Sequence, residues 1–228
     1  MKLLLLASAV LAAAAVPAAE FTYGAAPGAA VPDGNDSGFV STLVVPDLGL
    51  MISGLTVSLT LRGGPLGGWN GDLYAHVAHE GALSVLLNRP GRTATRPLGY
   101  NDNGFLDVTF DDAAPADVHL YRDFGGASPV TGLWQPDARA TDPAAVRDTD
   151  SRTLFLGGFD NLPAAGEWRL FVADLLPGGD VVLESWSITF RSSVDPIPEP
   201  GTLAGGAALL LLAAAAGRRR LTGAWCRP

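Results

Sequence analysis

Apolar and polar residues alternate with a period of two in several short stretches of this chain. The clearest stretch spans residues 52–61, where the apolar positions from Leu55 to Leu61 alternate with Thr56, Ser58 and Thr60. Such alternation turns one face of a β-strand toward a core and the other toward water. Similar stretches predict further strands at residues 39–45, 73–79, 83–87, 106–110, 168–172 and 181–190, and shorter ones at 118–121 and 153–159.

Turn-forming residues separate these predicted strands. The chain contains 28 Gly and 17 Pro, and Asp is far more frequent than Glu. Gly, Pro and Asp favour turns, so long helices are not expected. The pattern predicts an all-β fold, an antiparallel jelly-roll β-sandwich over residues 36–191. Residues 19–35 are expected to form a loose leader, and residues 125–150 a surface excursion with one short strand.

The N-terminus has the pattern of a secretory signal peptide. Lys2 precedes an apolar run over residues 3–16, and small residues at 16–18 suit a signal peptidase. Such a segment is removed during export and takes no part in the fold. Residues 1–18 are therefore expected to be a signal peptide, with signal peptidase as a processing partner.

The C-terminal segment, residues 192–228, contains three features in a fixed order. They are the motif Pro198-Glu199-Pro200, an apolar run over residues 202–217, and the basic cluster Arg218, Arg219 and Arg220. The run is slightly shorter than the roughly 20 residues that span a bilayer comfortably. Positive charges directly after it favour a cytoplasmic C-terminus. The sequence therefore predicts a C-terminal transmembrane helix.

These three features together resemble the PEP-CTERM sorting signal of Gram-negative bacteria. The resemblance implies that exosortase, a membrane protease-transpeptidase, recognises and removes the tail. The chain would then be held transiently in the inner membrane before it reaches the cell surface or the extracellular matrix. Exopolysaccharide and a secreted protease are the partners that such a location suggests.

Net charge and cysteine content argue against several classes of partner and of chemistry. The 23 acidic residues lie between Glu20 and Glu199 together with 10 of the 15 basic residues, which gives this body a net charge of −13. That charge disfavours nucleic acid and anionic membranes as partners, and it leaves divalent cations as candidate ligands. Cys226 is the only cysteine, so the body has no disulfide, thiol nucleophile or Cys-ligated zinc.

The body carries a second resemblance. Its motifs are Gly71-Asp72-Leu73, Asn88-Arg89-Pro90-Gly91, residues 107–112, residues 166–174, Gly179-Asp180, Leu183 and residues 186–190. These motifs are similar to the proprotein convertase P domain (P/Homo B domain). Arg89 departs from the pattern, because many relatives carry Ser or Gly there, and so does Val181, where the family has Gly. The resemblance implies a jelly-roll sandwich, which in convertases stabilises a subtilisin-like catalytic domain.

Three aspartates in these motifs are candidate calcium ligands: Asp72, Asp174 and Asp180. They are expected at strand ends or turns, where hard oxygen ligands suit Ca²⁺, and some members of the family bind it. Aspartates in turns also accept hydrogen bonds from backbone N–H groups, so both interpretations stand. Residues 111–112 form a second acidic pair, for which a solvated turn after a strand is the alternative interpretation.

Tryptophans provide candidate contact residues. Trp69 lies between glycine and asparagine in a predicted loop, and it is a candidate for stacking on a sugar or contacting a protein partner. Trp134 is a second candidate of this kind. Trp168 and Trp186 lie on predicted strands and are expected to fill the core.

No catalytic machinery is recognisable in the sequence. Gly-x-Ser-x-Gly and Walker motifs are absent, and His76 and His79 are expected on opposite faces of a strand, where they cannot share a zinc ion. Roughly 180 residues make one domain, which leaves no room for a subtilisin-like domain beside the sandwich. We therefore expect a non-enzymatic, exported cell-surface or matrix protein with a P domain-like binding or structural module.

Two other hypotheses remain open. In the first, the chain is an accessory domain that stabilises a separate, secreted subtilisin-like serine endopeptidase. In the second, it is a carbohydrate-binding jelly roll that contacts its ligand through Trp69.

Overall fold

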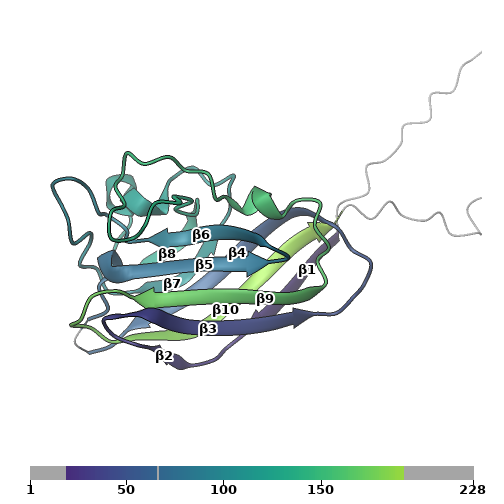
Figure 1. Ribbon diagram of the computed structural model, residues 1–228, viewed down its shortest axis with the longest axis horizontal. Coiled ribbons are helices and arrows are strands. Elements are labelled where there is room, and N and C mark those ends of the chain that lie inside the picture. Colours follow the sequence, from purple (N-terminus) through teal and green to yellow (C-terminus); the bar gives the residue numbers. More distant parts are fainter. Residues whose placement is uncertain (1–18, 66, 193–228) are drawn as a thin grey trace, which may run out of the picture. The chain divides into compact units, whose positions relative to one another are not determined.

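Two β-sheets pack face to face in the computed structural model, which describes residues 19–65 and 67–192 (Figure 1). Sheet A contains β1 (Ala19–Ala25), β2 (Ala29–Val31), β4 (Ile52–Gly63), β7 (Phe105–Phe110), β8 (Val130–Trp134) and β10 (Val181–Ser192). Sheet B contains β3 (Asn35–Val45), β5 (Leu73–His79), β6 (Ala82–Asn88) and β9 (Gly166–Asp174). The expected all-β sandwich is confirmed.

The strand order joins segments that are far apart in the sequence. Sheet A has the order β1-β10-β4-β7-β8, and β2 also pairs with β10. Sheet B has the order β3-β9-β5-β6. Neighbouring strands are antiparallel except for β7 and β8, which are parallel. The parallel pair departs from the expected fully antiparallel arrangement, and its strands are joined by a connection long enough to cross over.

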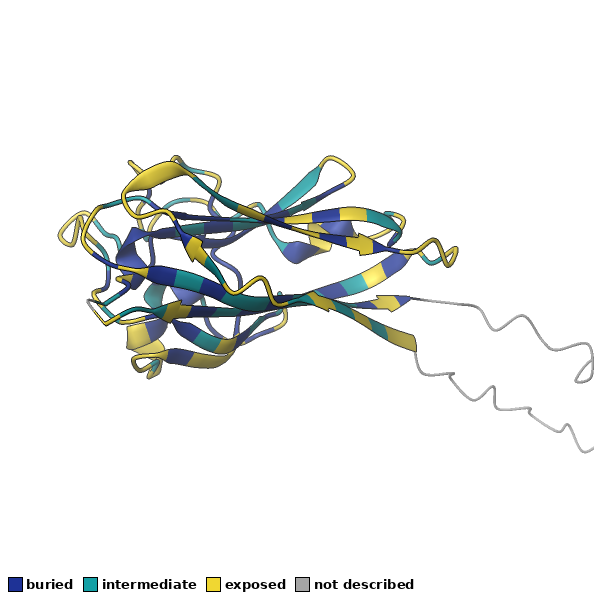
Figure 2. Cartoon of the chain, turned by 90° about the horizontal axis from the view of Figure 1, so that it is seen from below, coloured by how far each residue is buried: buried dark blue, intermediate teal, exposed yellow. Residues whose placement is uncertain are grey.

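Alternating residues of the predicted strands fill the space between the sheets. In β4, Leu55, Val57, Leu59 and Leu61 are buried, whereas Ser58 and Thr60 alternate with them on the outer face. Strand β5 coincides with the predicted residues 73–79 and alternates in the same way. Figure 2 shows buried residues alternating with intermediate and exposed ones along the strands, and many exposed residues in the loops. Burial of these apolar faces is what holds the sheets together.

Residues 19–35 are part of the sandwich, so the expectation of a loose leader is wrong. Strand β1 pairs with β10 from Ala19 to Ala25. Phe21 and Tyr23 stack on Phe190, with ring centroids 5.7 and 5.9 Å apart. The segment extends sheet A beyond the predicted boundary at residue 36.

Among the residues that the structure describes, three short 3₁₀ helices lie between the strands: η1 (Asn70–Asp72), η2 (Val118–Phe124) and η3 (Leu156–Phe159). The short strands predicted at 118–121 and 153–159 are therefore wrong. The carboxylate of Asp117 accepts a hydrogen bond from the backbone N–H of His119 at 2.9 Å, which caps η2. Gly125 ends it with φ of 83°, a conformation that glycine adopts easily.

Residues 125–150 are partly internal, in contrast to the predicted surface excursion. They contain the one short strand that was expected, β8. Asp137, Ala138, Arg139 and Val146 are buried. The N–H groups of Asp137 and Ala138 donate to the carbonyls of Leu86 and Val85, so the segment lies along β6, an edge strand of sheet B.

The predicted terminal segments fall mainly outside the described residues. These are the signal peptide, residues 1–18, and the PEP-CTERM motif with its apolar run and arginines, residues 198–220. Within residues 19–65 and 67–192, no helix has the length and apolar character needed to cross a bilayer.

Candidate functional site

Two of the predicted calcium ligands meet where strands β5 and β9 lie side by side. Asp72 ends η1 directly before β5, and Asp174 is the last residue of β9. Leu73 pairs with Asp174 in the sheet, and the N–H of Leu175 donates to the carbonyl of Asp72 at 2.9 Å. Both carboxyl groups are almost completely buried.

Arg89 joins this pair from the end of β6. Its backbone has φ of 52°, and its Nε donates to the carbonyl of Gly71 at 2.9 Å. Its Nη2 lies 3.5 Å from Oδ1 of Asp72, an ion pair longer than a normal hydrogen bond. Nη2 of Arg89 and Oδ1 of Asp174 are buried without a hydrogen-bond partner among the described residues. The sequence singled out Arg89 only as a departure from a motif.

Burial shifts the ionisation of both carboxyl groups. It raises the pKa of Asp72 to about 6, against the lowering effect of Arg89 and with a further rise from the charge of Asp33. Burial also raises the pKa of Asp174 to about 7, assisted by the charges of Asp72 and Asp33. When both carboxyl groups are ionised, two buried negative charges lie beside the single buried positive charge of Arg89. A proton on one carboxyl group removes this imbalance, and Asp174 binds it more readily because its pKa is the higher of the two.

The third predicted ligand, Asp180, does not join them. Its side chain is exposed in the turn before β10, where its N–H donates to the carbonyl of Gly67 at 2.9 Å. Within the described ranges, no group of three or more His, Cys, Asp or Glu side chains is arranged to hold a metal ion. The structure therefore does not assemble the predicted calcium ligands into one set.

The aspartates at residues 111–112 bind backbone groups. Oδ1 of Asp111 accepts from the N–H of Ala113 at 2.8 Å. The carboxylate of Asp112 accepts from the N–H groups of Leu156 and Gly157 at 3.0 and 2.7 Å. Asp111 thus stabilises a local turn, whereas Asp112 binds the backbone at the start of η3 and is not simply a solvated turn residue.

The raised pKa values predict a protein that is more stable in mild acid. The pKa of Asp174 rises from 3.8 to about 7 on folding, so the folded state holds a proton that the unfolded chain has released. The contribution of this proton to the free energy of unfolding is fully present below pH 3.8 and is lost as the pH rises through 7. A loss of about 2 kcal/mol between pH 5 and pH 8 would lower the melting temperature by roughly 4–8 °C.

Thermal unfolding at both pH values checks this expectation. The Asp174→Asn variant, which cannot ionise at this position, is expected to show a smaller difference between pH 5 and pH 8. A wild-type protein that melts at the same or a higher temperature at pH 8 would contradict the assignment.

Two cavities flank the Asp72–Arg89 pair. The Trp69 cavity, of about 390 Å³, is lined by Trp69, Asp72, Leu98–Asn101, Leu176 and Pro177. The Phe171 cavity, of about 610 Å³, is lined by Asp36, Tyr74, Arg89, Asp142–Ala144, Phe171, Leu175 and Leu176. Asp72 lines the first cavity, its ion-pair partner Arg89 lines the second, and Leu176 lines both. Sequence reasoning identified Trp69 and Asp72 here, but not Tyr74 or Phe171.

Trp69 is exposed, as its candidate role requires. The side chain lies directly before η1, and the residue is 42% exposed, while the nearby Leu98 is 67% exposed. Gly67 and Gly178 lie against its ring, since a Cβ on either residue would be within 3.5 Å of it. Trp134, the other candidate contact residue, is instead buried at the end of β8, and its Nε1 donates to the carbonyl of Thr131 at 2.8 Å. Trp168 and Trp186 are buried in the core as expected.

A buried ionic network lies near the connection after β8. Nδ1 of His119 is 2.6 Å from Oδ2 of Asp137, and Nε2 of His119 is 2.9 Å from the carbonyl oxygen of Arg92. Both oxygens only accept, so both ring nitrogens donate and the ring is protonated. Burial lowers the pKa of His119, but the hydrogen bond and charge of Asp137 outweigh it, and the pKa lies above its usual value.

Arg139 completes this network. Its Nη1 donates to Oδ1 of Asp137 at 3.1 Å, and its Nη2 to Oδ2 of Asp117 at 2.9 Å. Asp137 and Arg139 lie within residues 125–150, which were predicted to be a surface excursion, whereas His119 lies in a predicted short strand. The spacing of these residues in the sequence gave no signal of a network.

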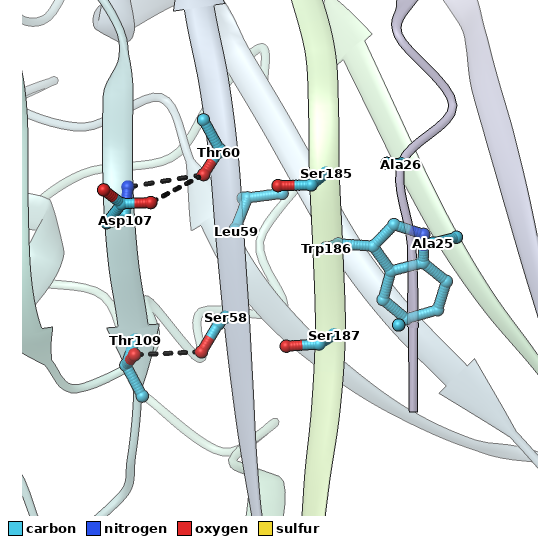
Figure 3. A pocket seen from close by; sticks show the side chains of 11 residues that line it. Ala25, Ala26, Ser58, Leu59, Thr60, Asp107, Thr109, Ser185, Trp186 and Ser187 are labelled. Atoms are coloured by element: carbon cyan, nitrogen blue, oxygen red, sulfur yellow. Dashed lines mark hydrogen bonds between the residues drawn. The ribbon is translucent and has the colours of Figure 1, made fainter. Parts of the chain in front are cut away.

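The outer face of sheet A carries a shallow hollow of about 510 Å³ (Figure 3). Its polar side chains come from β4, β7 and β10 and include Ser58, Thr109 and Ser187. The hydroxyls of Ser58 and Thr109 bind each other at 2.9 Å. Because these small groups partly satisfy one another, the hollow matches the polar, solvent-facing side of an antiparallel sheet.

Comparisons with known proteins do not assign a family or a function to this site. No family model matches the chain, and no curated protein matches it either. Among solved structures, the crystal structure of serine protease of Aeromonas sobria is similar to it, with a TM-score of 0.42 and 16% sequence identity. The similarity covers 80% of this chain and 28% of that chain.

Proposed function

We propose that this chain is an exported, non-catalytic binding module of the cell surface or extracellular matrix, built on a P domain-like jelly roll. The observation that carries the proposal is the Trp69 cavity. An exposed tryptophan and an exposed leucine border a cavity of about 390 Å³ with the buried carboxyl of Asp72 in its wall. Concave apolar sites with a few placed polar groups are typical binding sites.

The composition of this end of the sandwich supports binding to a partner. Trp69 and Leu98 are large apolar side chains on a strongly acidic body, where their exposure costs solvation free energy. Tryptophan is also enriched among residues that dominate interface energetics. A partner that covers both side chains would recover that free energy.

The His119–Asp137 pair does not have the geometry of a catalytic pair. A serine-type triad needs a histidine whose second ring nitrogen accepts a proton from a nucleophile. Here Nε2 of His119 donates to the carbonyl of Arg92 and the ring is fully buried. This pair therefore serves the fold, and we propose no catalytic role for it.

The terminal sequence patterns support export. In this proposal, the signal peptide directs the chain across the inner membrane, and exosortase removes the PEP-CTERM tail. The mature chain then remains outside a Gram-negative cell, with exopolysaccharide or a surface protein as its partner. The net charge of −13 between the termini suits a soluble extracellular module.

A second candidate function is favoured by the motif resemblance to the P domain. In this alternative the chain docks onto a secreted subtilisin-like protease and stabilises it. The apolar rim of the Trp69 cavity would then contact the protease. Stoichiometric recovery of such a protease with the chain, lost in Trp69→Ser, would favour the alternative.

The leading proposal is tested by where the protein resides. A strain lacking the chain would express wild type or the double variant Trp69→Ser/Leu98→Ser. Both proteins are expected to leave the cytoplasm. Wild type should remain with washed cells and their matrix, whereas most of the variant should be released into the medium.

Leu133→Ser provides a matched control. Leu133 is 50% exposed on β8 and lines neither cavity. This variant should be retained like wild type. Retention of the double variant, or accumulation of wild type in the cytoplasm, would refute the proposal.

A further inference from the structure

We propose that the Phe171 cavity binds a neutral saccharide. The proposal rests on the proposed function, because it assigns a ligand class to an exported binding module. It uses the cavity on the Arg89 side of the ion pair, rather than the Trp69 cavity that the sequence pointed to.

Aromatic rings form one wall of the Phe171 cavity. Tyr74, on β5, and Phe171, on β9, have ring centroids 6.1 Å apart at an interplanar angle of 61°. His76 stacks on Phe171 at 5.0 Å, which supports the ring from the neighbouring strand. The three rings project from the outer face of sheet B and are partly exposed. Such a wall can pack against the C–H face of a sugar ring, because aromatic faces are apolar and carry negative potential.

The backbone of β3 shapes this wall. The pairing of β3 with β9 shifts register between Asn35 and Phe39. Gly38, inside the shift, has φ of 53°, and a Cβ there would lie 2.7 Å from Cζ of Phe171 and 2.5 Å from the carbonyl oxygen of Val172. Glycine thus lets the Phe171 ring lie close over β3, and Asp36 on the same strand lines the same cavity.

The polar groups of the cavity include both acceptors and donors. Asp36 and Asp142 line it with exposed carboxylates. Arg89 lines it as well, and its Nη2 is buried without a hydrogen-bond partner among the described residues. A sugar hydroxyl can donate to a carboxylate and accept from a guanidinium at once, so a saccharide can satisfy both kinds of group.

The charges around Arg89 favour a neutral ligand. Asp72 already pairs with Arg89, and Asp36 and Asp142 lie around the same cavity. A uronate or phosphate would meet these carboxylates at close range and be repelled. A fully apolar ligand would bury the charged groups without hydrogen bonds, which costs free energy. A neutral, hydroxyl-rich ligand avoids both penalties.

Calorimetric titration of the purified full-length protein tests this inference. The probes are the neutral hexasaccharides cellohexaose, maltohexaose and xylohexaose, with hexagalacturonate as the anionic comparison. At least one neutral probe is expected to bind with a dissociation constant below about 1 mM. Hexagalacturonate is expected to bind at least tenfold more weakly than that probe.

Three variants assign the binding to this cavity. Phe171→Leu keeps apolar volume but removes the ring, and it should weaken binding roughly tenfold, or about 1.4 kcal/mol. Asp36→Ala removes an exposed carboxylate, so it should weaken binding without affecting the melting temperature. Leu133→Ala, on the exposed part of β8 outside the cavity, should leave the affinity within about twofold of wild type.

Binding of none of the three neutral probes would overturn the inference, and so would unchanged affinity in both Phe171→Leu and Asp36→Ala. Tighter binding of hexagalacturonate would overturn it too. Failure of this inference can be distinguished from failure of the proposed function. If no saccharide binds but retention on cells still depends on Trp69 and Leu98, the module binds another partner. If retention is also independent of these residues, both proposals fail.

Discussion

Asp137→Ala is expected to lower the free energy of unfolding by about 3–5 kcal/mol. Asp137 is fully buried and accepts hydrogen bonds from Nδ1 of His119 at 2.6 Å and from Nη1 of Arg139 at 3.1 Å. Removing the carboxylate leaves a buried imidazolium and a buried guanidinium without the anion between them. A buried charge without its partner is much more costly than the loss of a surface ion pair.

Urea denaturation at neutral pH measures the effect of Asp137→Ala. Asp123→Ala is the matched control, because Asp123 is exposed on η2 in the same region. The control is expected to change the free energy of unfolding by no more than about 0.5 kcal/mol. A loss below about 1 kcal/mol in Asp137→Ala would mean that the network contributes little to the fold.

Trp168→Ala is expected to destabilise the sandwich by about 3–5 kcal/mol. Trp168, on β9, is fully buried and stacks on His79 with ring centroids 4.1 Å apart and an interplanar angle of 3°. The ring of Phe159 packs against Trp168 with centroids 5.1 Å apart. Nε1 of Trp168 donates to the carbonyl of Ala164 at 3.0 Å. Alanine would leave a large cavity between sheet B and η3 and an unpaired carbonyl.

Arg169→Ala provides the comparison for Trp168. Arg169 is the next residue of β9, but its side chain points to the exposed face and pairs with Glu167 at the surface. Exposed pairs of this kind contribute about 0–1 kcal/mol. Equal destabilisation by the two substitutions, measured by thermal unfolding, would contradict the assigned faces of β9.

The strands that the sequence predicted best are those with one face in the core. Strand β4 keeps its leucines and valine inside and its hydroxyls outside, so burial and sequence share a period of two. Strand β1 lies at the edge of sheet A, and its residues are exposed or half-buried. Phe21, Tyr23 and Ala25 alternate there with exposed residues, but this alternation is short and the segment after it is rich in Ala, Gly and Pro, so residues 19–35 were predicted to be one loose leader.

The sequence predicted only those residues of the candidate site that lie in recognisable motifs at strand ends. Motifs at two strand ends identified Asp72 and Asp174, which lie at neighbouring ends because β5 and β9 are paired. Tyr74 and Arg89 come from the hairpin of β5 and β6, and Phe171 reaches the same region from β9, which is distant in the sequence. Local patterns carry no information on which distant strand ends meet, so these residues required the fold.

The proposals share one structural idea, which is that binding occurs at the end of the sandwich where the Asp72–Arg89 pair separates two cavities. Amide hydrogen exchange of the full-length protein, with and without extracellular matrix isolated from cells lacking the chain, tests it most directly. The matrix should slow exchange at residues 69–72, 98–101 and 171–178, and leave β4, β7 and β10 on the outer face of sheet A unchanged. Slowed exchange on that face, with none at the cavity residues, would contradict the account.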